Sequence, residues 1–378
     1  MRTIPTTTQA RIATHFAALT DPRRGKVTYP LINVVTIALC GMLCGADDFV
    51  SIAEWGRQKR DWLAKFLDLS AGIPSHDRFN AIFAALKPAE FERCLLSWIT
   101  ALHELSGGQL VAIDGKTLRR SFDAASSKAA IHMVSAWATA NHISLGQVVV
   151  DAKSNEITAI PKLLQILELS GALVTIDAMG CQTEIAQEIV AAGADYVLAV
   201  KRNQPTLHDG IVNFFDRHLE DDFARVKVSR HATQEKGHGR VEQRQYAVCA
   251  VPDDLPDARR WRNLKAIGLV TCEVEREGKH HVEARYYILS RKLTARSFAA
   301  AVRGHWSIEN RLHWQLDVTF GEDQSRLRKG HVDANASILR RAALSLLKNN
   351  QTHKLGLKNK RLCAGWSEPY LQELLFGA

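Results

Sequence analysis

The spacing of apolar residues changes character twice along the chain, and each change indicates a different kind of local structure. Residues 1 to about 105 carry apolar side chains at helical intervals, and the last of their segments has a proline near its first turn, as helices often do. This pattern predicts an all-helical accessory domain. Its four segments are Leu31–Ala46, Val50–Leu67, Ser75–Leu86 and residues 87–105.

After Gly107–Gly108 the pattern switches to short apolar runs that are typical of strands. Two segments with helical periodicity, residues 156–171 and 182–195, lie between the third and fourth runs and between the fourth and fifth. The order β-β-β-α-β-α-β predicts a mixed sheet with helices on its faces, in which the first and fourth strands are parallel neighbours. The five runs are Leu110–Asp114, Ile131–Thr139, Gln147–Asp151, Leu173–Asp177 and Tyr196–Val200.

Beyond Pro205 the chain is charged and irregular, and further strand-like runs precede a return of helical spacing at Ser297. The runs at Ala224–Val228, Gln243–Val251, Leu264–Glu275 and Val282–Leu289 predict a β-rich insertion in an α/β protein. The predicted boundaries are 1–106 for the helical domain, 107–204 for the first part of the core, 205–290 for the insertion, 291–350 for the second part of the core and 351–378 for a C-terminal tail.

Composition narrows the class of protein. The 378 residues are 46% hydrophobic and 24% charged, enough to bury a substantial core. The formal net charge of +9 indicates an anionic partner, most often nucleic acid, although many basic proteins bind none. Seven scattered cysteines indicate neither a zinc ribbon nor a disulfide framework. The longest apolar run, Leu31–Ala46, is shorter than the ~20 residues that a bilayer requires, so we expect a cytoplasmic protein without a membrane partner.

Two of the strand-like runs end alike, "GQLVAID" at Asp114 and "GALVTID" at Asp177. Apolar runs of this kind belong in the middle of a sheet, and ligands of α/β proteins bind at the carboxyl ends of such strands. Two carboxylates ~5 Å apart repel by about 3 kcal/mol at an effective dielectric near 20, so such a pair either shares a proton or binds divalent cations. The alternative is that each aspartate caps the turn that follows it.

A third carboxylate, Glu309, lies in the helical segment that begins at Ser297. An α-helix would place it on one stripe with Trp306, His313 and Leu316, at the edge of the apolar face, where an unpaired charge is costly. The alternative is a pairing of Glu309 with His305 or His313. Three carboxylates without cysteine suit two Mg²⁺ or Mn²⁺ ions, which can activate a water or a 3′-hydroxyl for attack on a phosphodiester.

Basic residues follow the first aspartate, the fifth strand-like run and the helical segment of Glu309, and they predict contacts to DNA phosphates, although a run of charges is usually only a solvated surface. Trp306 and Trp314 could stack on an unpaired base, but a place in the core is the favoured interpretation. The basic residues are Lys116, Arg119, Arg120, Lys201, Arg202, Arg326, Arg328 and Lys329.

In combination these motifs closely resemble the bacterial insertion-sequence transposases of the H-repeat-associated group, which belong with the DDE transposases. The resemblance covers most of the chain. It rests on "AIDGKTLRRS", "TIDAMGCQ", "YVLAVKRNQPTL", "GHGRVEQRQY" and the long segment from "HWSIENRLHWQLDV" to "RRAALSLL", and on "DPRRGKVTYPLINVVTIALCGMLCGADDFVSIAEWG" and "GIPSHDRFNAIFAAL" in the helical part.

The resemblance implies an RNase H-like core interrupted by the β insertion, with Asp114, Asp177 and Glu309 as catalytic and metal-binding residues. It also implies double-stranded DNA as the partner, both terminal inverted repeats and target, and a homodimer that is nucleoid-associated when on DNA. The tyrosine, arginine and lysine that often surround this glutamate are replaced by Val302, His305 and Leu316, which leaves Arg303 or Arg311 as substitutes.

Three other functions compete with a transposase. A nuclease of the same fold would cut DNA without joining it, and a repurposed DNA-binding protein would have lost the chemistry. A nucleotide-binding βαβ unit is the least favoured, because no GxGxxG motif follows either strand.

Overall fold

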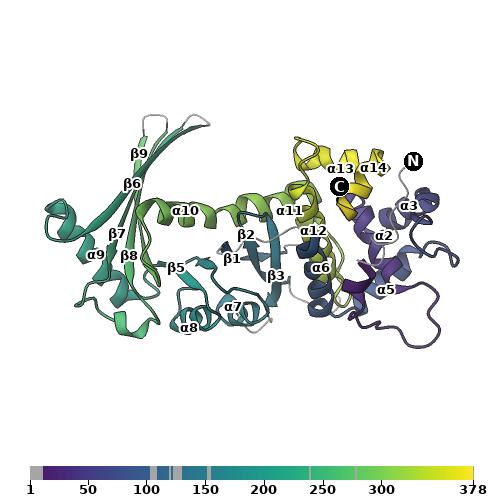
Figure 1. Ribbon diagram of the computed structural model, residues 1–378, viewed down its shortest axis with the longest axis horizontal. Coiled ribbons are helices and arrows are strands. Elements are labelled where there is room, and N and C mark those ends of the chain that lie inside the picture. Colours follow the sequence, from purple (N-terminus) through teal and green to yellow (C-terminus); the bar gives the residue numbers. More distant parts are fainter. Residues whose placement is uncertain are drawn as a thin grey trace.

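The computed structural model describes residues 12–102, 109–118, 121, 130–150, 155–237, 240–276 and 279–377. Along its long axis, a helical region lies at one end, a sheet in the middle and a β arm at the other end (Figure 1). Among the described residues, no helix is long and apolar enough to cross a membrane. All seven cysteines are unpaired, as the sequence predicts.

The helical region combines segments from both ends of the chain. Helix α2 is buried from Asn33 onwards, because the long C-terminal helix α12 and helix α3 pack against it. This enclosure explains why α2 is apolar on all sides. The two helices of the predicted tail also lie here (Figure 1). The helices are α2 (Leu31–Leu43), α3 (Phe49–Gln58), α4 (Arg60–Leu63), α5 (His76–Ala85), α6 (Pro88–Leu102), α12 (Val332–Asn349), α13 (Leu357–Trp366) and α14 (Glu368–Phe376).

The core sheet has the predicted topology. Its first three strands form antiparallel hairpins, and β4 and β5 are parallel to β1, in the spatial order β3-β2-β1-β4-β5. Helices α7 (Glu156–Leu164) and α8 (Thr183–Ala191) make the two crossovers. This is the RNase H-like arrangement. The strands are β1 (Leu110–Thr117), β2 (His132–Ala138), β3 (Ile143–Val150), β4 (Leu173–Ile176) and β5 (Asp195–Val200).

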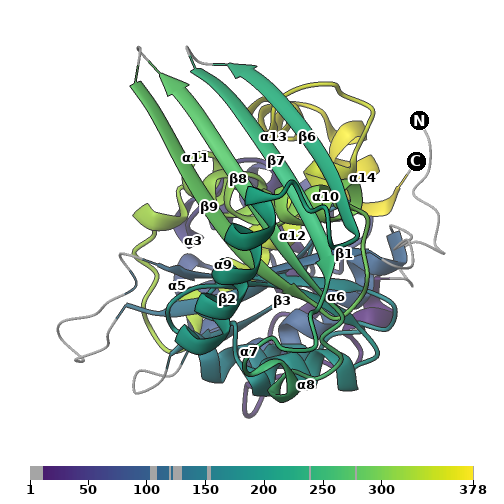
Figure 2. The same cartoon turned by 90° about the vertical axis from the view of Figure 1, so that its left-hand side faces the viewer.

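The insertion continues the same sheet. Strand β9 pairs antiparallel with β5, and β8, β7 and β6 follow to give nine strands in one sheet. These long strands extend beyond the core as the arm (Figure 2). The sequence did not predict helix α9, and the first predicted strand of the insertion ends at the residue where β6 begins. The elements are α9 (Pro205–Glu220), β6 (Val228–Gly237), β7 (Arg240–Ala250), β8 (Ala266–Arg276) and β9 (Lys279–Leu289).

One long helical unit runs across the face of the sheet from the arm to the helical region (Figure 1). It starts with α10 (Ala295–His305), which contacts β1, β4, β6 and β7, and continues through a π-helical turn, Glu309–His313, into α11 (Trp314–Phe320). A short 3₁₀ turn, η3 (Glu322–Gln324), leads towards α12. The prediction of one uninterrupted α-helical stripe is therefore wrong, because the wider π turn changes which residues face the sheet.

Candidate active site

Alternation along four strands builds a cavity of about 230 Å³ under the helical unit. Side chains two residues apart on a strand point to the same face of the sheet. The face that meets α10 therefore receives Asp114 from within β1, Asp177 just beyond β4, and residues of β5 and β9. The predicted end of the first strand at Asp114 is wrong, because β1 continues to Thr117 through its pairing with β2. Glu309 lines the same cavity from the π-helical turn. The fold thus brings all three predicted acidic residues to one cavity.

The pKa of Asp114 shows that these carboxylates affect one another. Burial raises the pKa of Asp114 to about 7, and a backbone hydrogen bond from Gly115 opposes the shift. The negative charges of Asp177, Glu156 and Glu309 raise it further. Glu156, in the first turn of α7, has no signal in the sequence that would associate it with this site.

Asp177 holds the turn that follows β4. Its Oδ1 accepts hydrogen bonds from the backbone N–H groups of Met179 at 3.0 Å and Gly180 at 3.3 Å. A Cβ at Gly180 would lie 2.3 Å from Ile176 Cγ2, so this tight turn requires glycine. The predicted alternative, an aspartate that caps its turn, therefore describes one role of Asp177, and the carboxylate still lines the cavity.

Glu309 is solvent-exposed, and its helical neighbours Ile308, Leu312 and His313 are buried. Among the described residues it makes no ion pair with His305 or His313. The Nδ1 atom of His305 lies 3.2 Å from Thr175 Oγ1 on β4. The Nδ1 atom of His313 lies 3.5 Å from Oδ2 of Asp114. The histidines on both sides of the glutamate thus contact the strands that lead to the two aspartates.

His313 is held neutral in this position. Burial lowers its pKa to about 3, with further contributions from Arg341 and Lys116, whose positive charges disfavour an imidazolium. Its Nε2 atom is buried and has no hydrogen-bond partner among the described residues.

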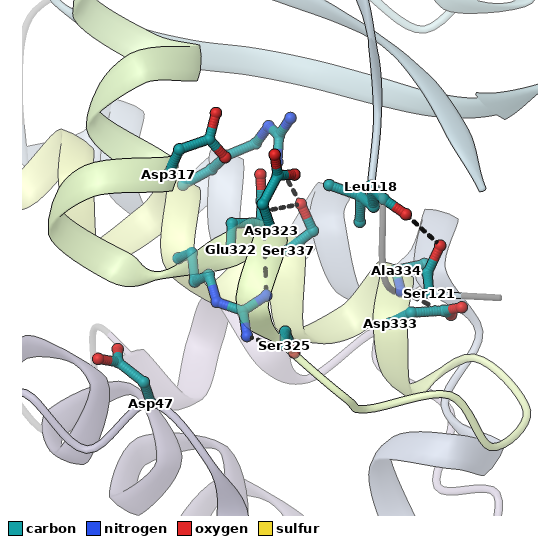
Figure 3. A network of polar contacts seen from close by, with 12 residues as sticks. Asp47, Leu118, Ser121, Asp317, Glu322, Asp323, Ser325, Asp333, Ala334 and Ser337 are labelled. Atoms are coloured by element: carbon teal, nitrogen blue, oxygen red, sulfur yellow. Dashed lines mark hydrogen bonds and ion pairs between the residues drawn. The ribbon is translucent and has the colours of Figure 1, made fainter. Parts of the chain in front are cut away.

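A buried network of charged and polar side chains surrounds Glu322 (Figure 3). Glu322 has a fully buried side chain, and its carboxylate accepts hydrogen bonds from Lys116 Nζ at 3.0 Å and Ser337 Oγ at 2.7 Å. Burial alone would raise the pKa of Glu322, but Arg341, Lys116 and Arg340 outweigh it and hold the pKa at about 2. The network ties strand β1 to η3 and to helix α12.

Lys116 is not placed to contact DNA, contrary to the prediction. Its side chain is only 9% exposed and forms ion pairs with Asp317 and Glu322. A cation enclosed by carboxylates is neutralised within the protein, and its release would leave buried charges unpaired. Strand alternation could have predicted that Lys116 points into the protein, because Lys116 is two residues from Asp114 and lies on the same face of the sheet.

The other predicted basic residues differ in their availability. Lys201 and Arg202 are exposed after β5, and Lys201 lines the cavity. Arg303 pairs with Glu235 at 2.8 Å, and Arg311 Nη1 lies 2.9 Å from His142 Nε2. The remainder are Arg326 and Lys329, both exposed, Arg328, half-buried, and Arg119 and Arg120, outside the described residues.

Two features of the cavity were missed or misjudged in the sequence. Trp306 and Trp314 are 41% and 54% exposed, so the favoured interpretation of both as core residues is wrong. Arg285 of β9 lies 5.1 Å from the centre of the Trp306 ring and lines the cavity with Glu283. These β9 residues were not predicted, because only the pairing of β9 with β5 brings them to the core.

The donor set suits a hard divalent cation, since carboxylate oxygens are the ligands that Mg²⁺ and Mn²⁺ prefer. Burial is the main cause of the raised pKa of Asp114, and the neighbouring negative charges, which a bound cation would offset, raise it further. Over the described ranges, no three His, Cys, Asp or Glu side chains are already close enough to hold a metal ion together.

The sheet topology, with an aspartate on β1 and another directly after β4, defines a protein of the RNase H-like class. The chain belongs to the transposase DDE domain family, whose model matches residues 105–346. A second model, described as DDE_Tnp_1-associated, matches residues 13–99, which correspond to the helical region.

Full-length relatives support this assignment. The chain is 36% identical to the H repeat-associated putative transposase YhhI of Escherichia coli K12, over 97% of this chain and 98% of that protein. It is 40% identical to the putative transposase YncI of Escherichia coli O157:H7, over 93% of this chain and 91% of that protein. The predicted resemblance to the H-repeat-associated group is confirmed.

Among solved structures, the piggyBac transposase synaptic complex with hairpin DNA aligns with 97% of this chain and 76% of that chain, at 11% identity and a TM-score of 0.43. The sequence identity and the TM-score are too low for the roles of residues in that protein to be assigned to residues of this chain.

Proposed function

We propose that this member of the transposase family catalyses divalent-metal-dependent cleavage and strand transfer of DNA at the ends of an insertion sequence. The observation that supports it most is the meeting of Asp114, Asp177 and Glu309 at one cavity, although they come from β1, the turn after β4 and a helical turn far apart in the sequence. A core with no such function would gain nothing from collecting like charges, which repel one another.

In this proposal the three carboxylates hold one or two Mg²⁺ or Mn²⁺ ions. Such ions would activate the attacking hydroxyl and stabilise the oxygen that leaves the phosphorus atom. The chain's own residues orient the metal ligands. Asp177 is fixed by its turn and Asp114 by its place within β1, and Glu309 is exposed and free to approach both.

The partner would be double-stranded DNA. Lys201 lines the cavity and Arg202 lies beside it, where they can contact phosphates next to the cleaved bond. Trp306, supported by Arg285, offers an exposed aromatic surface at the cavity wall. We further propose that two copies act together on two DNA ends, since each copy carries one set of carboxylates.

The test uses the purified full-length chain and a plasmid that carries its coding sequence with the native flanking DNA. We expect cleavage at the element ends with Mg²⁺ or Mn²⁺ and none with EDTA. Asp114→Asn, Asp177→Asn and Glu309→Gln should each reduce cleavage at least 10³-fold and leave DNA binding in Ca²⁺ within threefold. Glu184→Gln, an exposed carboxylate on α8, is the matched control and should cleave like the wild type.

The outcomes separate the competing functions. Cut ends without joined products in a strand-transfer assay would indicate a nuclease. Specific binding without any cleavage by the wild type would indicate a repurposed DNA-binding protein. Cleavage that survives the loss of Asp114 and Asp177 together would place the chemistry elsewhere.

A further inference from the structure

The helical unit contacts strand β1 through two pairs of side chains with the same spacing. Asp114 and Lys116 point to the same face of β1, and His313 and Asp317 lie one helical turn apart. His313 contacts Asp114, and Asp317 pairs with Lys116. Two strand residues span ~6.8 Å and four helical residues span ~6 Å, so the spacings agree and both contacts form at once.

We propose that His313 is a positioning residue that orients the carboxylate of Asp114 for metal binding. This inference rests on the proposed function. His313 belongs to the same π-helical turn as Glu309, so its contact with Asp114 links two of the three proposed ligands through one rigid segment.

The surroundings of His313 leave its ring little freedom. The side chain is 8% exposed, and Nδ1 is the ring nitrogen that faces Oδ2 of Asp114, at 3.5 Å. With its proton on Nδ1, the imidazole can donate to that carboxylate. Nε2 is buried and has no hydrogen-bond partner among the described residues, so no second polar contact of the ring competes with this one. A histidine that served only to fill the core would not need to direct a nitrogen at a carboxylate.

The neighbouring contact explains how the orientation is maintained. Lys116 forms ion pairs with both Asp317 and Glu322, so the end of β1 cannot slide along the helix without breaking a buried pair. This second contact fixes the register, and His313 then sets the direction of one carboxylate. Outer contacts of this kind contribute 10–100-fold to metal affinity in known metal sites.

The experiment measures Mn²⁺ binding to the full-length protein without DNA, by electron paramagnetic resonance titration. His313→Leu should weaken binding 10–100-fold. His313→Asn, whose side-chain amide reaches the position of Nδ1, should bind within threefold of the wild type, and His313→Gln, which places its amide at Nε2, should behave like the leucine variant. The contrast between Asn and Gln tests orientation even if the leucine variant folds poorly.

A second buried histidine provides the matched control. His218 on α9 has a side chain that is 12% exposed and an Nδ1 atom 3.8 Å from a carboxylate oxygen of Asp221, and it does not line the cavity. His218→Leu should leave Mn²⁺ binding unchanged. An equal loss in both leucine variants would overturn the proposal, because it would reflect a general effect of replacing a buried histidine.

Asp114→Asn separates this inference from the proposed function. If Asp114→Asn loses Mn²⁺ binding while His313→Leu binds like the wild type, only the role of His313 is wrong. If Asp114→Asn also binds like the wild type, the metal site itself is wrong, and the role of His313 is overturned with it.

Discussion

Replacing Glu322 by glutamine should cost the protein about 3 kcal/mol of unfolding free energy at neutral pH. The side chain is completely buried, and its charge is balanced by Lys116, Arg341 and Arg340. Breaking a buried ion pair by removing one partner typically costs 3–5 kcal/mol. The depression of the Glu322 pKa from 4.5 to about 2 corresponds to a similar amount, at about 1.4 kcal/mol for each pH unit.

The pH dependence gives a second and independent signature. The pKa of Glu322 is lower in the folded state, so its contribution is complete above pH 4.5 and is lost as the pH falls towards 2. Urea unfolding followed by circular dichroism should therefore show a large difference between wild type and Glu322→Gln at pH 7, and a smaller one near pH 3. Glu54→Gln, which removes an exposed carboxylate paired with Arg57, should leave the urea midpoint unchanged.

A Glu322→Gln protein that unfolds at the wild-type urea concentration at pH 7 would refute this reasoning. It would mean that the two arginines and Lys116 tolerate the loss of their common partner, and that the network does not hold β1 to α12. A constant difference from pH 7 to pH 3 would refute the assignment to charge and indicate lost packing.

Three further predictions concern the site and its supports. In metal-free buffer, Asp114→Asn should melt above the wild type at pH 8 and together with it at pH 4, because the raised pKa means that stability is lost as the pH rises through about 7. In urea denaturation, Trp306→Ala should change the free energy of unfolding by less than about 0.5 kcal/mol. Trp98→Ala, which removes a side chain that is 2% exposed, should cost about 3–5 kcal/mol. Similar losses in the two variants would mean that Trp306 is a core residue after all. Gly268→Ala should cost about 1–3 kcal/mol, since its methyl would lie 2.7 Å from a phenylalanine ring atom, and Gly356→Ala, with open space around it, should not; equal midpoints for the two would contradict the close approach.

The sequence predicts the core sheet well because its signals are local. Short apolar runs ending in Asp114 and Asp177, with helical segments between them, indicate the order of strands and helices along the chain. The right-handedness of crossovers between parallel strands then determines how those strands are arranged in the sheet. The parallel pairing of β1 with β4 places Ile113 beside Ile176, so the two aspartates that follow emerge together.

The errors arise where the outcome depends on contacts between distant segments. Helix α9 has an apolar stripe at Leu207, Ile211 and Phe215, but most of its other residues are polar or charged, so the helical periodicity of apolar residues is weak. The π-helical turn inserts an extra residue into a helix, and the spacing of apolar residues in the sequence does not predict such a turn.

The basic residues show a further limit of sequence reasoning. A lysine next to an acidic site looks the same whether it contacts phosphate or a buried carboxylate. Lys116 differs from Lys201 only in what the fold places opposite it, three acidic side chains from α11 and η3 in one case and open solvent in the other.

The pairing of β9 with β5 makes the arm inseparable from the core. Excision of the insertion would strip one whole side of β5, next to the strand that leads to Asp177, and leave its peptide groups without partners. A force applied to the arm would likewise pass through interstrand hydrogen bonds directly to the strands that carry the aspartates. The arm is thus continuous with the strands that lead to the two aspartates, and a load on its outer strands would reach those strands through the backbone pairing of the sheet.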